Sequence, residues 1–211
     1  VESVDVAGVH PALKDSRFTV ACDVNNPFCG PDGAAFVYAR QKGADEEMIR
    51  ELDKGMFSLS EVIKKTTGKD IVNLPGAGAA GGMGGSFVAF LDATLKPGIE
   101  LLLDYQDFDR KIEGADLVIT GEGRVDRQTV MGKAPWGVLQ AARKHGIPVI
   151  VIAGSVEDVE VINEAGFLSV FSVTPRPVSL EKAMEPDFAG ENIRRLITQI
   201  CRTMTVISEL L

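Results

Sequence analysis

The chain has 211 residues, of which 45% are hydrophobic and 25% are charged, and its formal net charge is −8. These values are typical of a globular protein with one large or two small domains. The negative charge and the absence of a block of Lys or Arg argue against a nucleic-acid or anionic-membrane surface, so neither partner is expected. No apolar run is long enough to span a bilayer, and three cysteines without a CxxC pair suit the reducing environment of the cytoplasm.

The first predicted strand ends at an acid. Residues 17–24, RFTVACDV, are rich in β-branched and apolar side chains, and a segment dense in turn formers follows. Asp23 therefore lies where a strand meets a loop, which makes it a candidate general base and metal ligand. Asn25 and Asn26 are candidates for substrate binding, although turn formation and helix capping would explain them as well.

A long helix is predicted over residues 44–67. Asp45 is a plausible N-cap with acids in the first turn behind it, and Gly68 is a typical helix stop.

A glycine-rich run occupies residues 75–86 and leads into a predicted helical segment, 87–94. Three of its glycines match G-x-G-x-x-G, but the dinucleotide motif requires a strand directly before it, and residues 71–75 are short and end in proline. Small residues also expose backbone N–H groups to anions, whereas close helix packing would explain them equally. The candidate phosphate-binding residues of the run are Gly76, Gly78, Gly81 and Gly82.

The second half of the chain alternates regularly, which predicts a parallel, Rossmann-like βαβαβ arrangement. The expected strands are 117–120, 148–153 and 168–173, and the expected helices are 135–145, 157–165 and 191–211. Composition shifts near residues 97–114. We therefore expect two domains: residues 1–112, a portion of a Gly-rich α/β domain on the substrate side, and residues 113–211, a portion of a Rossmann-like βαβ domain.

Residues 116–135, DLVITGEGRVDRQTVMGKAP, carry the densest set of functional groups. A buried strand is expected to end at Thr120 and to open into a polar loop, and ligands of α/β proteins lie at the carboxyl ends of such strands. The candidate catalytic residues of this stretch are Glu122, Asp126 and Lys133. The candidate substrate ligands are Arg124 and Gln128, and the candidate metal ligands are Asp126 together with Asp23.

These groups suit phosphoryl transfer better than covalent catalysis. No Ser-His-Asp arrangement or Cys-His pair is present, and Gly132-Lys133 is not a P-loop, because Arg127 and Ala134 stand where Gly and Ser or Thr are required. In phosphoryl transfer, carboxylates hold Mg²⁺, cations and amides neutralise the transferred group, and a further carboxylate accepts the proton of the acceptor hydroxyl.

Several segments, in order, resemble the bacterial glycerate kinase family, which acts on D-glycerate with ATP. They read CDVNNPFCGPDGAA, QKGA, PGAGAAGGMGG, LKPGIELLLD, DLVITGEGRVDRQTVMGKAP and PVIVIAGS. The resemblance covers nearly the whole chain, and the TGEG-x-x-D-x-Q-T block is its most specific part. It implies two α/β domains, ATP and Mg²⁺ as cofactors, D-glycerate as the substrate, and a phosphoglycerate product, with the 2-phosphate favoured.

The chain departs from that family in one respect. Members carry a long N-terminal portion that this chain, which starts at Val1 without a Met, lacks; we expect part of the Rossmann-like domain and of the active site to come from there. A sheet completed by another copy, and hence a homo-oligomer, stays open. So do two other classes: a dinucleotide-dependent oxidoreductase and a non-catalytic fragment. The central hypothesis is that Asp23, the glycine run and residues 122–133 face one cleft.

Overall fold

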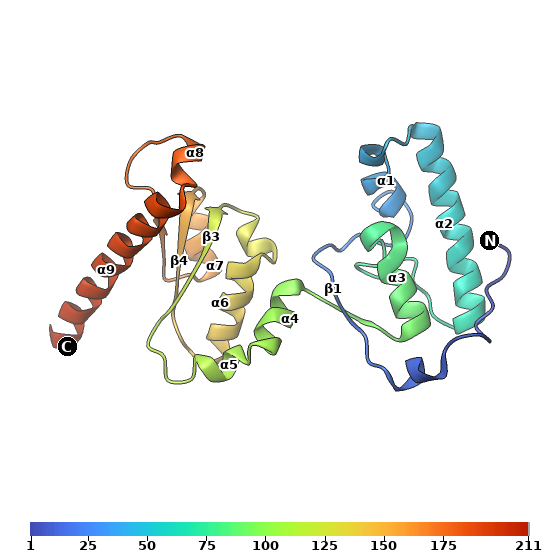
Figure 1. Ribbon diagram of the computed structural model, residues 1–211, viewed down its shortest axis with the longest axis horizontal. Helices are drawn as coiled ribbons and strands as arrows, with labels where there is room; N and C mark the ends of the chain where they lie inside the picture. The colour runs from blue at the N-terminus through green and yellow to red at the C-terminus, as the bar shows by residue number, and fades with distance from the viewer. Residues whose placement is uncertain (211) are drawn as a thin grey trace. The chain divides into compact units, whose positions relative to one another are not determined.

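The structure, a computed structural model, describes the backbone of residues 1–210 and the side chains of residues 1–205 (Figure 1). The chain folds into two compact units, Val1–Leu101 and Leu102–Leu211, and each is an α/β assembly with parallel strands. The boundary between the two units follows Leu101, which is earlier in the chain than the boundary expected at 112/113. The reason is that Leu103, Phe108 and Ile112 pack into the core of the second unit.

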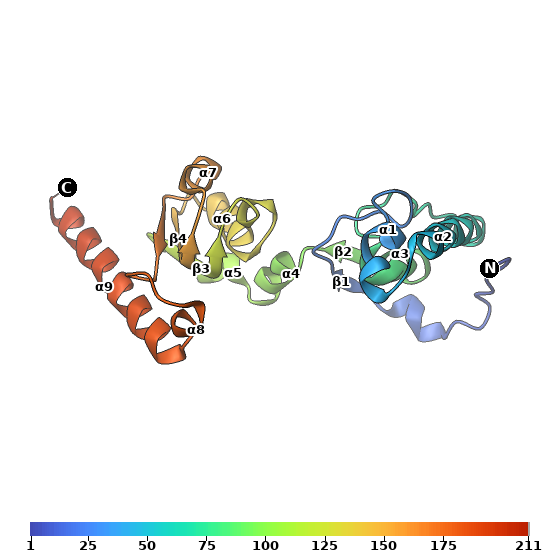
Figure 2. The same ribbon diagram turned by 90° about the horizontal axis from the view of Figure 1, so that it is seen from above.

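The first unit is built on two short parallel strands, β1 (Thr19–Ala21) and β2 (Thr94–Lys96). Figure 2 shows them side by side, next to helices α1 and α3. The helices and 3₁₀ turns of this unit are η1 (Pro11–Asp15), α1 (Ala34–Tyr38), η2 (Arg40–Lys42), α2 (Glu46–Thr67) and α3 (Ala79–Leu91), and α4 (Gly98–Tyr105) begins in it. Its core contains Phe28, Ile63, Ile71, Ala77 and Ala89.

Helix α2 confirms the prediction made for this segment. The side chain of Asp45 accepts a hydrogen bond of 2.9 Å from the N–H of Met48, which satisfies an amide of the first turn. At the other end Gly68 adopts a left-handed conformation with φ 76°, which a side chain would disfavour.

The second unit has the predicted βαβαβ order. Its three strands, β3 (Val118–Val125), β4 (Val149–Val156) and β5 (Ser169–Ser172), are parallel and neighbour one another in chain order. The helices and turns are α5 (Phe108–Lys111), η3 (Thr129–Met131), α6 (Ala134–Lys144), α7 (Val159–Ala165), α8 (Leu180–Ala183) and α9 (Pro186–Leu210). Helix α9 begins at Pro186, which is earlier in the chain than the expected residue 191.

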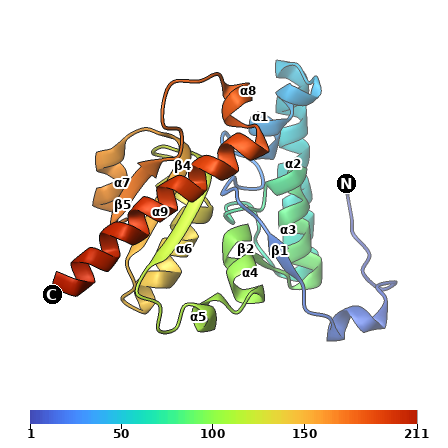
Figure 3. The same cartoon turned by 60° about the vertical axis from the view of Figure 1, so that its left-hand side comes forward.

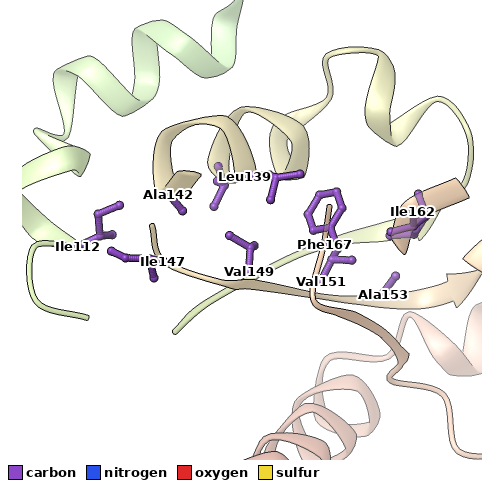
Figure 4. Packing of buried hydrophobic residues seen from close by; sticks show 11 residues of the cluster. Ile112, Leu139, Ala142, Ile147, Val149, Val151, Ala153, Ile162 and Phe167 are labelled. Carbon is purple, nitrogen blue, oxygen red and sulfur yellow. The ribbon is translucent and has the colours of Figure 1, made fainter. Parts of the chain in front are cut away.

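The two faces of this sheet are covered differently. On one face Val151 and Ala153 point toward Leu139 of α6 and form the buried core (Figure 4). Strand residues alternate between faces, so Ile152 and Gly154 point to the opposite side. Helix α9 crosses that opposite side (Figures 1 and 3). Across the described residues, no helix combines the length and apolar character that crossing a bilayer requires.

Candidate active site

The polar segment predicted as a loop is part of strand β3. The expected strand ended at Thr120, and this prediction is wrong, because β3 continues to Val125. The cause is β4, which pairs with β3 along its whole length and places Glu122 opposite Ala153. Strand geometry therefore sets the direction of these side chains, which gives them firmer positions than a loop would.

Glycines in both strands permit this pairing. A Cβ atom at Gly121 would lie 2.8 Å from the carbonyl oxygen of Ile152, and one at Gly154 would lie 2.8 Å from the carbonyl oxygen of Gly123. Side chains at these two positions would push the strands apart. A Cβ at Gly123 would meet no atom within 4 Å, so this glycine opens onto free space.

Thr129 connects the two acids of the segment. It is fully buried in η3, and its hydroxyl donates a hydrogen bond to Oε1 of Glu122. The Oγ1 atom of Thr129 in turn accepts a hydrogen bond of 3.1 Å from the N–H of Asp126. Within the described part of the chain the Glu122 carboxylate accepts no other hydrogen bond. Glu122 is thus a half-buried carboxylate with one oxygen held in place and the other available.

Donors surround Asp126. Its Oδ1 accepts from the N–H of Gln128 at 2.8 Å and from Nζ of Lys133 at 3.3 Å. Its Oδ2 lies 3.5 Å from Nε of Arg124. Burial alone would raise the pKa of Asp126, but this N–H and the two cations outweigh it and hold the pKa below its ordinary value. Asp126 thus lies between two cations, and its role as a magnesium ligand stays a prediction.

The cations of this segment are all in ion pairs. Besides Asp126, Arg124 contacts Glu157 at 2.8 Å, and Arg127 lies 3.3 Å from Asp158. Such exposed pairs contribute little to stability, so a phosphate or carboxylate ligand can replace the acidic partner at small cost. The side chain of Gln128 is exposed, and its role in substrate binding stays a prediction.

Asp23 lies beyond the end of β1, as expected. Its Oδ1 accepts the N–H of Gly98, the first residue of α4, at 2.7 Å. The side chain is exposed, and its second oxygen accepts no hydrogen bond from the described residues. Asp23 therefore helps to start α4 and retains one oxygen for a ligand.

The two asparagines after Asp23 differ. Asn26 donates to the carbonyl oxygen of Asp32 at 2.9 Å and accepts from the hydroxyl of Tyr38 at 2.6 Å, so it holds the turn together. Asn25 is exposed. Substrate binding by either residue stays a prediction, and the contacts of Asn26 favour the structural role.

The glycine run forms the start of α3, which begins at Ala79 and not near residue 87 as expected, and the backbone is kinked at residues 80–82, where φ is positive. A Cβ at Gly78 would lie 2.2 Å from the carbonyl oxygen of Pro27, and one at Gly84 would lie 2.3 Å from the carbonyl oxygen of Gly76. Close packing of backbone on backbone therefore explains these glycines.

The backbone N–H groups of the run are largely used within the fold. Those of Gly78, Gly81 and Gly82 all donate to backbone carbonyl groups. Turns and not a strand precede the run, so the dinucleotide motif lacks the context it requires. Anion binding by these residues and by Gly76 stays a prediction.

The predicted site residues fall into both units. Asp23 and the glycine run belong to the first unit, and residues 122–133 belong to the second. A common cleft stays a prediction, as do the roles of these residues. In the portion that the structure describes, no three His, Cys, Asp or Glu side chains gather into a metal site.

A pocket of about 900 Å³ in the second unit was missed by sequence reasoning. It lies between residues 121–124 of β3, residues 152–155 of β4, and the segment that contains α8 and α9. Asn192 of α9 lines it. A signal was present, because Asn192 continues the four-residue spacing of Leu196 and Ile200 and so places a carboxamide on an otherwise apolar face. Thr129 was not among the predicted site residues either, although it is the last residue of the TGEG-x-x-D-x-Q-T block.

Residues 1–205 match the sequence profile of the Glycerate kinase family. The chain belongs to the glycerate kinase family. This confirms the resemblance inferred from the sequence, and the α/β class with parallel strands agrees with it.

Among family members, the glycerate kinase of Bacillus cereus is 46% identical over 99% of this chain and 55% of its own length. The Escherichia coli K12 relative named glycerate 2-kinase is 44% identical over 98% of this chain and 54% of its own length. A crystal structure of a Salmonella typhimurium LT2 protein, assigned as a glycerate kinase 2, superposes with a TM-score of 0.81 at 40% identity. The superposition covers 98% of this chain and 53% of the Salmonella protein. The chain thus spans about half the length of these relatives.

Proposed function

We propose that this chain takes part in the ATP-dependent phosphorylation of D-glycerate, with 2-phosphoglycerate as the product. The observation that carries the proposal is the 46% identity with a relative named glycerate kinase over 99% of the chain. The name of the Escherichia coli relative, glycerate 2-kinase, supports the 2-phosphate. A cytoplasmic location accords with the three free cysteines.

Glu122 is the general base of the proposed reaction. Thr129 holds one of its oxygens, and the other is available to accept the proton of the glycerate hydroxyl. A positioned carboxylate in this role contributes about 10²–10⁴-fold to the rate.

Lys133 and Arg124 bear the negative charge of the transferred phosphoryl group and of the glycerate carboxylate. Lys133 is the N-cap residue of α6, where the positive end of the helix dipole adds to its charge. Asp126 contacts both cations, so its proposed role is to position them before the ligands arrive.

Mg²⁺, when bound, supplies charge neutralisation on the ATP phosphates. Of the two predicted ligands, Asp23 fits this role, because it is exposed and has one free carboxylate oxygen. Asp126 fits this role less well, since a metal ion there would compete with Lys133 and Arg124 for its carboxylate.

A coupled assay tests the proposal. D-glycerate, ATP and Mg²⁺ are supplied, and 2-phosphoglycerate is detected through enolase, pyruvate kinase and lactate dehydrogenase, with phosphoglycerate mutase added to reveal any 3-phosphate. The assay uses both the polypeptide as its source produces it and residues 1–211 alone. We expect NADH oxidation without the mutase. Absence of any phosphoglycerate from both preparations contradicts the proposal.

The role of Glu122 is tested with Glu122→Gln, which should lower kcat by about 10²-fold or more while the KM for ATP changes little. Glu164→Gln is the matched control, because Glu164 is an exposed acid of α7 without a partner among the described residues. Near-normal turnover by Glu122→Gln removes Glu122 as the base. Activity confined to the polypeptide as its source produces it would support the alternative that residues 1–211 are not catalytic by themselves.

A further inference from the structure

The pocket beside α8 and α9 has no role in the phosphoryl transfer as proposed above. Its wall on the helix side is apolar and includes Leu180, Met184 and Phe188. Leu180 and Met184 are 74% and 70% exposed, so large apolar side chains stand at an open cavity. A mostly apolar cavity of this size with a few polar groups is typical of a small-molecule site.

The wall on the sheet side is flat. Residues alternate between faces along a strand, so Gly121, Gly123 and Gly154 share the face of Ile152, opposite the core that contains Ala153. The three glycines add no side chains to this face, on which Ile152 supplies one. At Gly123 even a Cβ would have open space around it. A flat floor under an apolar roof accommodates a planar ring.

One buried polar group faces this cavity. Asn192 is only 6% exposed, it lines the pocket, and its carboxamide forms no hydrogen bond with any described residue, although its polar atoms are not completely closed off from solvent. A largely buried amide loses free energy when it has no partner, so such a group is expected to bond to water or to a ligand. Phe188 lies one helical turn before Asn192 on the same face. The missing partner of Asn192 is therefore expected to be a ligand that also contacts the apolar roof.

We propose that this pocket binds the adenine ring of the nucleotide and that Asn192 recognises its edge. A carboxamide offers a donor and an acceptor side by side, which matches the N7 acceptor and N6 amino donor of adenine. The choice of adenine over another base rests on the proposed function, in which ATP is the phosphoryl donor. Glu122 and Arg124, two of the candidate site residues, also line the pocket, so an adenine ring in the pocket brings its phosphates to the same strand segment.

Adenosine, which lacks phosphates, is the first probe. Calorimetric titration should show binding of adenosine, weaker binding of inosine, which lacks the N6 amino group, and loss of this preference in Asn192→Leu. Asn192→Asp keeps the size of the side chain and removes its donor, and both variants should weaken adenosine binding by about tenfold to a hundredfold. Gln199→Leu is the control, because it removes an exposed carboxamide from the same helix.

A steric test is independent of Asn192. Gly123→Leu projects a side chain into the pocket from a strand position whose φ suits any residue, and it should abolish adenosine binding. Gly190→Leu is the matched control, since Gly190 also has open space for a Cβ but does not line the pocket. Near-native circular dichroism spectra of both variants establish that the fold is retained.

Kinetics separate this inference from the proposed function. One outcome is that the protein phosphorylates D-glycerate with ATP while Asn192→Leu and Gly123→Leu leave the KM for ATP unchanged. In that outcome the adenine ring binds elsewhere, and only the inference about the pocket fails. If adenosine binding depends on Asn192 but no phosphoglycerate forms, the pocket stands and the proposed function fails. Adenosine that does not bind, or that binds all variants equally, overturns the inference.

Discussion

Replacing Thr129 with Val tests whether the buried hydroxyl holds Glu122 and Asp126 in place. The change keeps the shape of a fully buried side chain and removes its only polar atom. The carboxylate of Glu122 then loses a donor, and the N–H of Asp126 loses its acceptor at 3.1 Å. We expect the second unit to become less stable and Glu122 to lose its fixed orientation.

The magnitude follows from the two lost contacts. A hydrogen bond to a charged group contributes about 1.5–3 kcal/mol, and a buried amide without a partner costs about 1–3 kcal/mol. Glu122 is only half-buried, so water replaces part of the first contact. We expect the free energy of unfolding to fall by about 2–4 kcal/mol in Thr129→Val. With the dependence of the free energy of unfolding on urea that is typical of a small unit, the urea concentration at the unfolding midpoint falls by about 2 M.

The chain provides its own probe for this measurement. Its single tryptophan, Trp136, lies on α6 and packs against the core of the second unit, so its fluorescence during urea titration reports on that unit. Thr129→Ser is the control, because it keeps the hydroxyl and loses one methyl group, at about 1 kcal/mol. Equal destabilisation by Ser and Val, or a loss below about 1 kcal/mol in Val, refutes the assigned role of the hydroxyl.

Three further changes address other parts of the structure. Gly154→Ala places a Cβ 2.8 Å from a carbonyl oxygen of β3 and should cost about 1–3 kcal/mol in thermal or urea unfolding, whereas Gly190→Ala on the exposed surface of α9 should gain about 0.5–1 kcal/mol. The lowered pKa of Asp126 means that its contribution to stability is complete above its ordinary value of 3.8 and is lost as the pH falls through the lower folded value. Lys133→Met should therefore lower the urea midpoint most near neutral pH and least in acid, and a pH-independent difference contradicts this assignment. Asp45→Ala removes the cap of α2 and should cost about 1 kcal/mol, measured as faster amide hydrogen exchange in the first turn; unchanged exchange there rules out the cap.

Much of the fold could be predicted because its local signals agree. Asp45 and Gly68 mark the ends of α2, and the alternation after Asp116 predicts three parallel strands with helices between them. The end of β3 could not be predicted in this way. Residues 121–125 have a composition typical of a loop, yet the pairing with β4 makes them a strand. Such pairing depends on a segment that lies elsewhere in the chain, so no local pattern reveals it.

The same distinction holds for the site. Local sequence alone predicts functional roles for Glu122, Asp126 and Lys133, because acids and cations beside glycines after a buried strand are unusual on a bare surface. Only the tertiary structure decided that Thr129 fixes Glu122, that cations and an amide occupy Asp126, and that Asn192 faces a cavity. The physical reason is that a residue's identity limits which bonds it can form, whereas burial and the positions of its partners depend on how distant segments pack.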